Sequence, residues 1–367
     1  MAKANTFGEP DSLKLAVVLF NLGGPDKASS VEPFLFNLFN DPAIIRLPGL
    51  LRWLVAKLIS RRRAPVAAEI YAHLGGGSPL LANTEAQATA LAEALADLGQ
   101  VKIFLAMRYW HPMAPETVKA VAAFAPDRVV LLPLYPQFSS TTTGSSLKQW
   151  NSLAAKLGLK APARAVCCYP SEAGLVAAMA DLVRDAYQKV SAGQPTRILF
   201  SAHGLPERVI EAGDPYQFQV ERTAEAVVAK LGIEDLDWSI CYQSRVGPLK
   251  WIGPSTDDEI RRAGTDGKAI VLSPIAFVSE HSETLVELDI EYRHLANEVN
   301  VPRYERVPTV STAPDFISGL AQLVRRAATG EGKLMCGEGA PICAAKLGLC
   351  PYRSGMNTLL ATAGLDA

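Results

Sequence analysis

The sequence predicts an α/β protein in which two domains each contain a parallel β-sheet. Three observations point to this fold class. The chain has 367 residues and is 49% hydrophobic, which suffices for the cores of two domains. Short apolar runs alternate with stretches of helical periodicity, and this alternation is typical of parallel sheets covered on both faces. The pattern restarts after the Gly- and Pro-containing link 190–197, so the domain boundary is expected within 165–195.

Six short apolar runs carry the strand signal. They are 15–20, 101–107, 128–134, 197–203, 237–243 and 268–277. Helices are expected between most of these runs, for example at 84–98 and 175–190. We therefore expect an N-terminal domain at 1–175 and a C-terminal domain at 176–327. The remainder, 328–367, is an extension that is rich in Gly and Cys and has no strand signal.

The overall charge and the N-terminal sequence limit the partners and the compartment. A net charge of -1 offers no basic face for phosphates, which argues against a nucleic-acid-binding protein. The first apolar run is too short for a signal peptide, and no run reaches the ~18 residues of a membrane span. We therefore expect a cytoplasmic protein with reduced thiols, whose six cysteines are metal ligands or spectators rather than disulfides.

Nucleotide-binding loops are not predicted. The segment NLGGPDKASS at 21–30 follows the first strand but matches neither G-x-G-x-x-G nor a Walker loop. Pro25 also removes a backbone amide that would bind phosphate. The glycine-rich LGGGSPL at 74–80 follows a helical stretch rather than a strand. The fold class alone therefore does not indicate a dinucleotide enzyme.

His203 stands at the carboxyl end of an apolar strand and precedes a Gly-x-Pro turn. A parallel sheet presents side chains at this position to the crevice where ligands bind. A lone histidine is nevertheless more often satisfied by a neighbouring carbonyl group than used in chemistry. The functional interpretation of His203 therefore depends on a second group of residues.

That second group lies in PIAFVSEHSETLVELDIEY, residues 274–292. A helix is expected to begin near Ser279 or Ser282, since either residue is a suitable N-cap. Four acidic residues then share one side of the helix at about 100° per residue. They are Glu280, Glu283, Glu287 and Glu291. Like charges four residues apart destabilise a helix, so helix stability does not explain the row. A solvated face is one explanation, and it suits Glu287 and Glu291 best.

Glu283 and His281 differ from the rest of the row because they follow directly on a strand and lie between apolar Phe277 and Leu285. This setting indicates a cavity. A carboxylate and imidazoles in an apolar cleft can bind a divalent metal or act as a base. Together with His203, the segment therefore predicts a site that moves metal ions or protons.

Several long motifs resemble those of the ferrochelatase family, whose members insert ferrous iron into a porphyrin in the last step of haem biosynthesis. The motifs span nearly the whole chain in the family's order. They are LFNLGGPD (19–26), RRRAPVAAEIYAHLGGGSPL (61–80), MRYWHP (107–112), LLPLYPQFSSTTTGSSL (131–147), SAHGLPERVIEAGDPY (201–216), YQSRVGPLKWIGPST (242–256) and the segment 274–292. The resemblance implies two similar Rossmann-like, chelatase-type domains with four-stranded parallel sheets and a substrate cleft between them.

The same resemblance implies roles for the candidate residues. Two pyrrole protons must leave when iron enters, and a neutral base is needed because pyrrole N–H groups are very weak acids. His203 would be this base or a metal ligand, Glu283 its partner across the pocket and His281 a supporting residue. An acidic path for metal or protons would comprise Glu280, Glu287 and Glu291.

The resemblance also assigns the substrate pocket, for which protoporphyrin IX and Fe²⁺ are the expected substrates. Coproporphyrin is the alternative, since it differs only in carboxylates at the rim. A solvated turn is the alternative for at least one of the arginines at 61–63. The assigned residues are Tyr109, Trp251 and Phe277 against the macrocycle, Arg63, Tyr71 and Ser78 at the propionates, and Arg108 as a further pocket residue.

The stretch LPGLLRWLVAKLIS at 47–60 is apolar around most of its helical circumference and precedes three arginines. Core packing is one interpretation. The resemblance implies instead a lip, 47–63, over the porphyrin pocket, which also makes a peripheral contact with the inner face of the cytoplasmic membrane. An apolar lip favours protoporphyrin over coproporphyrin.

Cys336, Cys343 and Cys350 recur every seventh residue in the extension. Spectator thiols are one interpretation, and zinc or an iron–sulfur cluster is another. The resemblance implies a [2Fe-2S] cluster held by these three cysteines and one from the body of the protein. The oligomeric state is left open by the sequence, and the extension could support a homodimer. Animal-type members carry the fourth cysteine where this chain has Ser139 and Ser140. The fourth ligand is therefore expected at Cys168 or Cys167, or less readily at Cys241.

The sequence leaves two other classes of function open. A mononuclear zinc hydrolase could use His203, His281 and Glu283, but the chain lacks H-E-x-x-H spacing and the apolar lip would have no purpose. A non-enzymatic sensor that binds haem or an iron–sulfur cluster is the other alternative. Porphyrin-dependent consumption of Fe²⁺ would distinguish the enzyme from the sensor.

Overall fold

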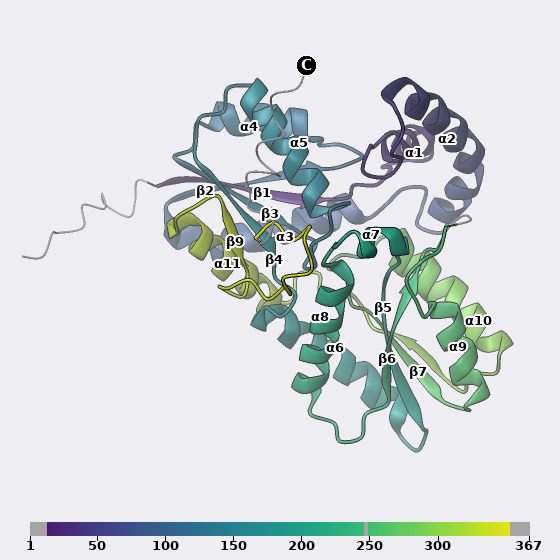
Figure 1. Cartoon of the computed structure of the whole chain (residues 1–367). Helices are drawn as coiled ribbons and strands as arrows, with labels where there is room; N and C mark the ends of the chain where they lie inside the picture. Colours follow the sequence, from purple (N-terminus) through teal and green to yellow (C-terminus); the bar gives the residue numbers. More distant parts are fainter. Residues whose placement is uncertain (1–12, 246–248, 353–367) are drawn as a thin grey trace, which may run out of the picture.

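The computed structural model describes residues 13–245 and 249–352 and contains two parallel β-sheets (Figure 1). The first has the strand order β2-β1-β3-β4-β9 and the second the order β6-β5-β7-β8. The first four strands of each half thus follow the same order, which confirms the expected α/β fold with two similar parallel sheets. The strands are β1 (Lys14–Asn21), β2 (Gln100–Met107), β3 (Arg128–Pro133), β4 (Ala163–Cys168), β5 (Thr196–His203), β6 (Trp238–Gln243), β7 (Ala269–Pro274), β8 (Tyr304–Arg306) and β9 (Leu334–Cys336).

Six of these strands match the predicted runs, and β4, β8 and β9 were not predicted. The sequence of β4, ARAVCC, mixes an arginine with small residues and so lacks a continuous apolar signal. The strands β8 and β9 have only three residues each. Because β9 pairs with β4 in parallel, the extension adds a fifth strand to the first sheet, contrary to the expectation of no strand there.

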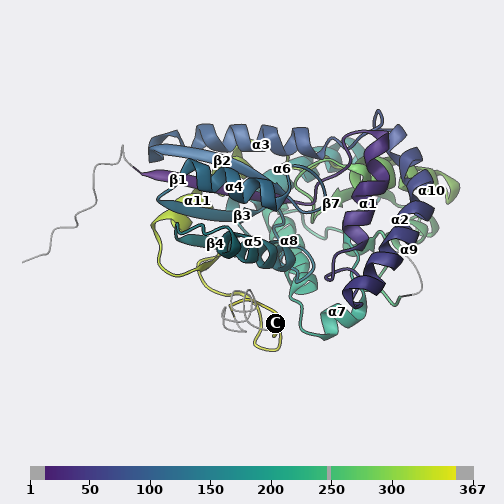
Figure 2. The same cartoon turned by 90° about the horizontal axis from the view of Figure 1, so that it is seen from above.

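Helices lie on both faces of the sheets (Figure 2). The predicted helix at 175–190 is present as α6, and the one at 84–98 as α3 followed by a short 3₁₀ turn. The helices are α1 (Val31–Phe39), α2 (Gly49–Ala72), α3 (Leu80–Ala94), α4 (Ala114–Phe124), α5 (Thr143–Lys156), α6 (Ala173–Ser191), α7 (Glu207–Glu211), α8 (Tyr216–Leu231), α9 (Thr256–Thr265), α10 (Tyr292–Glu298) and α11 (Pro314–Thr329).

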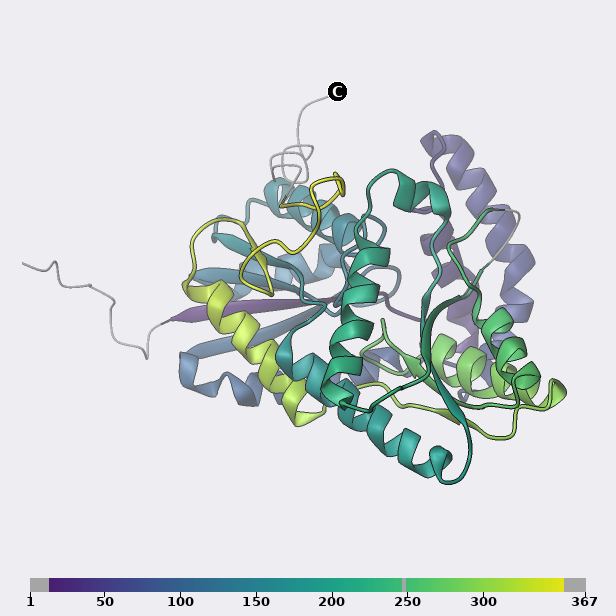
Figure 3. The same ribbon diagram turned by 60° about the horizontal axis from the view of Figure 1, so that its bottom comes forward.

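Helix α11 returns from the second half to the first. It packs against α6, α3, β3 and β4 (Figure 3). The apolar residues on its buried face belong to a single core cluster that also contains residues of β1 and β5. The predicted C-terminal domain, 176–327, therefore includes a helix that covers the first sheet. Residues 1–12 of the predicted N-terminal domain and 353–367 of the extension lie outside the described residues.

Two side chains of α3 bind the second half directly. The buried Gln87 donates from Nε2 to the carbonyl oxygens of Val278 and Ser311, at 2.8 and 2.9 Å. Its Oε1 accepts a hydrogen bond from the Ser279 hydroxyl at 2.9 Å. Asn83 Nδ2 donates to the carbonyl oxygen of Glu280 at 2.9 Å. These bonds fix the segment 278–281, which leads into the candidate site, on the first half of the molecule.

The predicted lip is part of α2, which stands beside α1 at one side of the molecule (Figure 2). Five of its large apolar side chains are exposed to solvent: Leu50, Leu51, Trp53, Leu54 and Leu58. Core packing therefore does not account for the apolar stretch 47–60. Among the described residues, no helix has the length and apolar character needed to cross a membrane.

Candidate active site

The candidate site lies where β5 and β7 end. Both strands run in parallel as neighbours, with Ser201 of β5 opposite Pro274 of β7. His203 is the last residue of β5, and the chain that follows β7 reaches His281 and then Glu283. Neighbouring parallel strands present their carboxyl ends at one edge of the sheet, so residues 80 positions apart in the sequence meet there.

His203 and Glu283 are in direct contact. The distance from His203 Nδ1 to Glu283 Oε2 is 2.9 Å. His281 approaches the same oxygen with Nε2 at 3.9 Å, while its Nδ1 lies 3.1 Å from the carbonyl oxygen of Ser279. The ring of Phe277 packs on the imidazole of His281 with 4.7 Å between centroids. The structure thus brings together the three residues expected to carry the chemistry.

The contact changes the protonation of both partners. Burial lowers the pKa of His203, but the Glu283 carboxylate, together with the charge of Glu287, raises that pKa by more, so it lies above its ordinary value. Burial raises the pKa of Glu283, yet His203, followed by His281, holds that pKa well below its ordinary range. Below the raised pKa of His203, an imidazolium therefore faces a carboxylate.

Three of the four acidic residues of the row, Glu283, Glu287 and Glu291, lie on a π-helix, Glu283–Glu291, instead of the expected α-helix, and Glu280 precedes it. The helix begins next to Ser282, one of the two predicted positions, but without the capping bond expected there. The Ser279 hydroxyl binds Gln87, and Ser282 makes no capping bond with its side chain. The i→i+5 hydrogen bonding of a π-helix is often found at functional sites. Its pattern was not visible in the sequence because the spacing of the glutamates also fits an α-helix.

Glu287 lies about one turn along the π-helix from Glu283, and its carboxylate is fixed by hydrogen bonds. Its carboxylate accepts hydrogen bonds from Gln243 Nε2, from the backbone N–H and hydroxyl of Ser244, and from the Tyr292 hydroxyl. Burial, together with the charge of Glu283, raises the pKa of Glu287. Glu287 is therefore more readily protonated than an ordinary glutamate.

Glu291 and Glu280, at the two ends of the predicted acidic row, have different surroundings. Glu291 is exposed and borders a groove of about 910 Å³ lined in part by His73 and His294. Glu280 accepts a 2.6 Å hydrogen bond from Arg306, whose guanidinium also binds Asp289. The Glu280 carboxylate also accepts a bond from the backbone N–H of Thr309. The structure therefore brings Glu280 to Arg306 and not to Glu283.

Of the predicted pocket residues, Tyr71 and Phe277 lie close to the His203–Glu283 pair. Tyr71 is buried, and its hydroxyl makes a hydrogen bond with Ser282. Burial, and to a lesser extent Glu283, raises the pKa of Tyr71 to about 12, so the phenol stays protonated. Trp251 is half-buried, and its indole Nε1 has no partner among the residues the structure describes. The motif that carries Trp251 includes 246–248, which lie outside the described residues.

Arg108 and Tyr109 share a partner that the sequence did not indicate. Arg108 Nη2 donates to Asp41 Oδ2 at 2.7 Å, and the Tyr109 hydroxyl donates to the same oxygen at 2.8 Å. Asp41 is buried just before the lip helix α2. The side chains of Arg108 and Tyr109 therefore anchor the base of the lip. Asp41 carried no signal in the sequence, because an acidic residue in a connecting segment usually faces solvent.

The remaining residues assigned to the propionates, Arg63 and Ser78, differ in their exposure and in their hydrogen bonds. Arg63 is exposed on α2. Ser78 is half-buried, its backbone N–H donates to the carbonyl oxygen of Pro25, and its hydroxyl accepts from the N–H of Leu80. Gly24 packs so closely on Ser78 that an added Cβ would lie 2.6 Å from its side chain. Ser78 is thus tied to the loop after β1.

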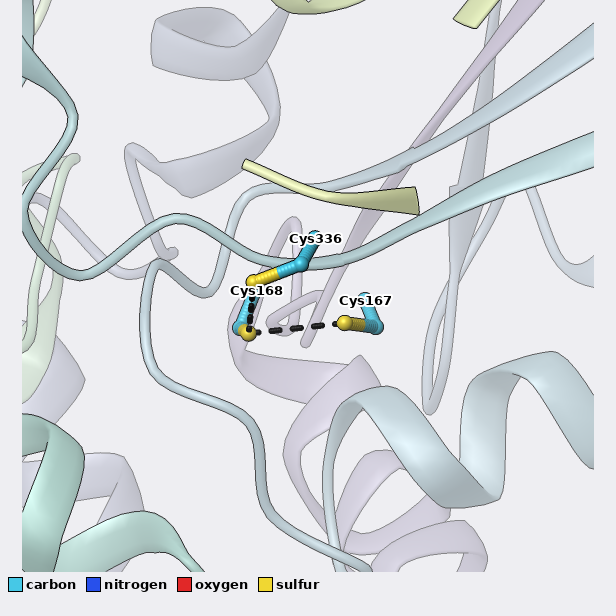
Figure 4. A group of neighbouring side chains, drawn as sticks. All are labelled: Cys167, Cys168 and Cys336. Carbon is cyan, nitrogen blue, oxygen red and sulfur yellow. Dashed lines mark hydrogen bonds between the residues drawn. The ribbon is translucent and has the colours of Figure 1, made fainter. Parts of the chain in front are cut away.

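The cysteines form a buried group at the edge of the first sheet. Cys167, Cys168 and Cys336 offer three sulfur atoms within 4.8 Å of one another (Figure 4). The sulfurs of Cys167 and Cys168 are 3.4 Å apart, and those of Cys168 and Cys336 are 3.8 Å apart. Hydrogen bonds from Cys167 and Cys168 lower the pKa of the Cys336 thiol to about 3. Such a thiolate can bind a soft metal.

Cys343 and Cys350 lie beside this group in a small buried cluster of the extension. A hydrogen bond with Cys350, followed by burial, raises the pKa of Cys343, and the charge of Cys168 acts in the same direction. Cys241, by contrast, is buried in the core of the second sheet, where its thiol donates to the carbonyl oxygen of Phe200. The structure therefore gathers five of the six cysteines and leaves Cys241 apart.

Comparisons with known proteins agree with this site. The family model described as Ferrochelatase matches residues 14–328, which end where the predicted extension begins. A ferrochelatase from Caulobacter vibrioides is 59% identical over 350 residues, covering 93% of this chain and 98% of the relative. A ferrochelatase from Phenylobacterium zucineum is 54% identical over 94% of this chain and 99% of its own length.

A solved structure of SirB from Bacillus subtilis with Fe³⁺ has the same fold. Its TM-score is 0.52 at 10% sequence identity, and the match covers 86% of this chain and 96% of SirB. At this identity the likeness concerns the fold alone, whereas the matches in sequence extend over most of the chain. The chain therefore belongs to the ferrochelatase family.

Proposed function

We propose that this ferrochelatase inserts Fe²⁺ into protoporphyrin IX beside the His203–Glu283 pair and releases two protons to form protohaem. The observation that carries the proposal is the 2.9 Å contact between His203 Nδ1 and Glu283 Oε2. A base and an ionised carboxylate stand together at the carboxyl edge of a parallel sheet, where ligands bind in this type of fold. Two aromatic side chains lie at the site: Phe277 packs on His281, and the buried Tyr71 is close enough to Glu283 for its pKa to be raised by that charge.

His203 suits the role of the base. The imidazole must be neutral to take a pyrrole proton, and Glu283 then stabilises the imidazolium that forms. The same carboxylate that raises the pKa of His203 thus favours proton transfer to it. The arriving Fe²⁺ carries two positive charges and repels this proton, so metal binding and proton release favour each other.

Glu287 and Glu291 provide a route away from the site. Glu287 has a raised pKa and four hydrogen-bond donors around it, so it can hold a proton or a cation in turn. Glu291 opens onto the groove that His73 and His294 border. Glu280 is left out of this route because its charge is already neutralised by Arg306.

The lip supports protoporphyrin as the substrate and the membrane as its source. Leu50, Leu54 and Leu58 stand at spacing i, i+4, i+8 on α2 and are 78%, 52% and 70% exposed. Arg61, Arg62 and Arg63 follow on the same helix and are exposed. An apolar face with basic residues at its end suits peripheral contact with anionic lipid, into which a hydrophobic porphyrin partitions.

The cysteine group fits a [2Fe-2S] cluster. Such a cluster is normally held by four thiolates. Cys168, Cys336, Cys343 and Cys350 would hold it, with Cys167 as the alternative to Cys168. The group is buried, and its donor atoms are all sulfur. When bound, the cluster would tie the extension to β4, a structural contribution, since metal insertion itself transfers no electrons.

The direct test is anaerobic incubation of the purified protein with Fe²⁺ and protoporphyrin IX. Loss of porphyrin fluorescence and appearance of the haem spectrum well above the rate without protein is the expected result. Coproporphyrin in a parallel reaction tests the choice of substrate: faster turnover of coproporphyrin would overturn the protoporphyrin assignment. Absence of turnover with both porphyrins would overturn the proposed reaction.

A further inference from the structure

A buried junction joins the cysteine extension to both halves of the molecule. Helix α8 of the second half lies beside the segment 136–143 that follows β3 and beside the extension (Figures 1 and 3). The backbone N–H of Leu349 donates to the carbonyl oxygen of Gly213, which precedes α8. Asp214 accepts hydrogen bonds from the hydroxyls of Ser139 and Ser140. Three parts of the chain that are distant in sequence therefore meet at the start of α8.

Gln219 of α8 is the side chain that touches both other parts at once. Its Oε1 accepts a 2.7 Å hydrogen bond from the backbone N–H of Phe138 in the first half. Its Nε2 donates to Cys343 Sγ in the extension at 3.2 Å. The Gln219 side chain is fully buried. A Phe138 N–H can only donate, so it fixes the oxygen end of the amide and turns the NH₂ group toward the sulfur.

An N–H donor has a specific effect on a cysteine that ligates iron. It withdraws negative charge from the thiolate, which stabilises the reduced form of a cluster and raises its reduction potential. It also lowers the basicity of the sulfur and protects the ligand from protonation and loss. A leucine at position 219 would lose the donor, and a glutamate would replace it with a second negative charge. A side-chain amide offers both the acceptor for the Phe138 N–H and the donor for Cys343 Sγ.

We infer that Gln219 is a positioning residue that tunes a cluster bound through Cys343 and makes its stability depend on the contact between the two halves. This inference rests on the [2Fe-2S] cluster of the proposed function. The carbonyl end of the amide is bound to the first half and its NH₂ end to the cluster ligand. Displacement of one half against the other therefore withdraws the donor from Cys343.

Gln137 supplies a matched control. It is also a buried glutamine of this junction, and its Nε2 donates to Thr223 Oγ1 of α8 at 2.9 Å and to the carbonyl oxygen of Ile275 at 3.3 Å. Within the described part of the chain, Gln137 makes no hydrogen bond to a cysteine. Gln137→Leu thus removes an amide that joins the same two halves while the donor to Cys343 stays in place.

The test compares Gln219→Leu, Gln219→Glu, Gln137→Leu and the wild type, all purified anaerobically as full chains. Iron and acid-labile sulfide, the visible spectrum, the reduction potential and the rate of bleaching by a chelator are measured on each. Both Gln219 variants are expected to have a more negative potential and to bleach several-fold faster. Gln219→Glu keeps the acceptor for Phe138, so it separates the change at Cys343 from loss of the contact with Phe138. Gln137→Leu is expected to match the wild-type potential.

The outcomes separate this inference from the proposed function. A wild-type cluster with an unchanged potential in both Gln219 variants would overturn the inference and leave the cluster in place. An equal shift in Gln137→Leu would also overturn it, because the effect would then come from general loosening of the junction. A wild type without iron and sulfide would overturn the cluster and the inference together, while insertion of Fe²⁺ by the same preparation would leave the catalytic proposal standing.

Discussion

His203 and Glu283 act as a couple, because each changes the protonation of the other. The imidazole is held by the carboxylate at 2.9 Å, and His281 stands behind that carboxylate at 3.9 Å. A neutral glutamine at 283 would keep the size of the side chain and remove its charge. Glu283→Gln therefore tests the effect of the Glu283 charge on His203 without a change in side-chain size.

The first prediction concerns the base. His203→Ala removes the group that takes the pyrrole protons, so iron insertion should fall by at least two orders of magnitude, the contribution typical of a general base. Porphyrin binding, measured by fluorescence quenching, should stay nearly unchanged because the macrocycle is held by other residues. His111→Ala is the control, since His111 is exposed and pairs with Glu116. Near-normal turnover in His203→Ala would refute the assignment of the base.

The second prediction concerns pH. His203 must be neutral to act, and its pKa is raised by Glu283, so the rate should rise with pH through a value above the ordinary histidine pKa. In Glu283→Gln, burial still lowers the pKa of His203 and is opposed only by the charge of Glu287, so the rise should move to lower pH while the maximal rate drops severely. The pH profile of kcat/KM checks both effects. If the pH profile of Glu283→Gln matched that of the wild type, the observed ionisation would not be that of His203.

Residue types and motifs were enough to find this couple, but not its surroundings. His203 stands at the end of one apolar run and Glu283 shortly after another, and both positions carry a signal in the sequence. Asp41, Gln87 and Gln219 carry none, because their functions arise from burial beside partners that are distant in the chain. The pairing of Glu280 with Arg306 is of the same kind, since it depends on β8, which was not predicted.

At the scale of elements, α2 and the extension are additions to the two four-stranded arrangements that the halves share. Helix α2 exposes a row of leucines, and the extension buries its cysteines against β4. The apolar stretch of α2 was visible in the sequence, as were the recurring cysteines. The π-helix was not, because hydrogen-bond registers i→i+4 and i→i+5 place the same acidic residues on one side. Short strands such as β9 were missed because three residues carry too little pattern.

The third prediction concerns the lip. Replacing Leu50, Leu54 and Leu58 together by serine removes three exposed apolar side chains, so binding to vesicles that contain anionic lipid should drop at least tenfold. The thermal midpoint should hardly change because these side chains are not in the core. Co-sedimentation with vesicles measures the binding, and Leu157→Ser, at another exposed leucine, is the control. Equal sedimentation of all three proteins would contradict a membrane contact through α2.

The fourth prediction concerns the extension. Cys336→Ser removes the thiol that joins the group at β4, so the iron and sulfide content should fall to near zero. Cys241→Ser should leave the content at the wild-type level, because Cys241 lies in the other sheet. Metal analysis and the visible spectrum decide between these results. A spectrum that survives in Cys336→Ser and disappears in Cys241→Ser would reverse the assignment of ligands.

On the scale of the whole molecule, the two halves are joined through buried polar contacts as well as a shared core. Gln87 makes three hydrogen bonds to the segment 278–311 of the second half. Composition and alternation predicted two α/β units, and the family resemblance implied four-stranded parallel sheets. The order of the strands was not predicted. The interlocking of the units was not predicted, since helix α11 has the same amphipathic pattern whichever sheet it covers.

The fifth prediction concerns this connection. Gln87→Leu leaves buried groups of Val278, Ser279 and Ser311 without partners, so the free energy of unfolding should fall by about 2–4 kcal/mol. Iron insertion should fall as well, because the same segment leads to His281 and Glu283. Chemical denaturation and the insertion assay measure the two effects. The control Gln322→Leu changes an exposed glutamine, and an identical result for both variants would remove Gln87 from the connection.

The return of α11 and β9 to the first sheet has a consequence for biosynthesis. The ribosome completes β1 to β4 long before it adds residues 314–336, which supply the neighbour of β4 and the helix beside β3. Until then the nascent first half has an open strand edge and an uncovered apolar face, features that invite aggregation. The first half can therefore reach its complete form only after these late segments have been made.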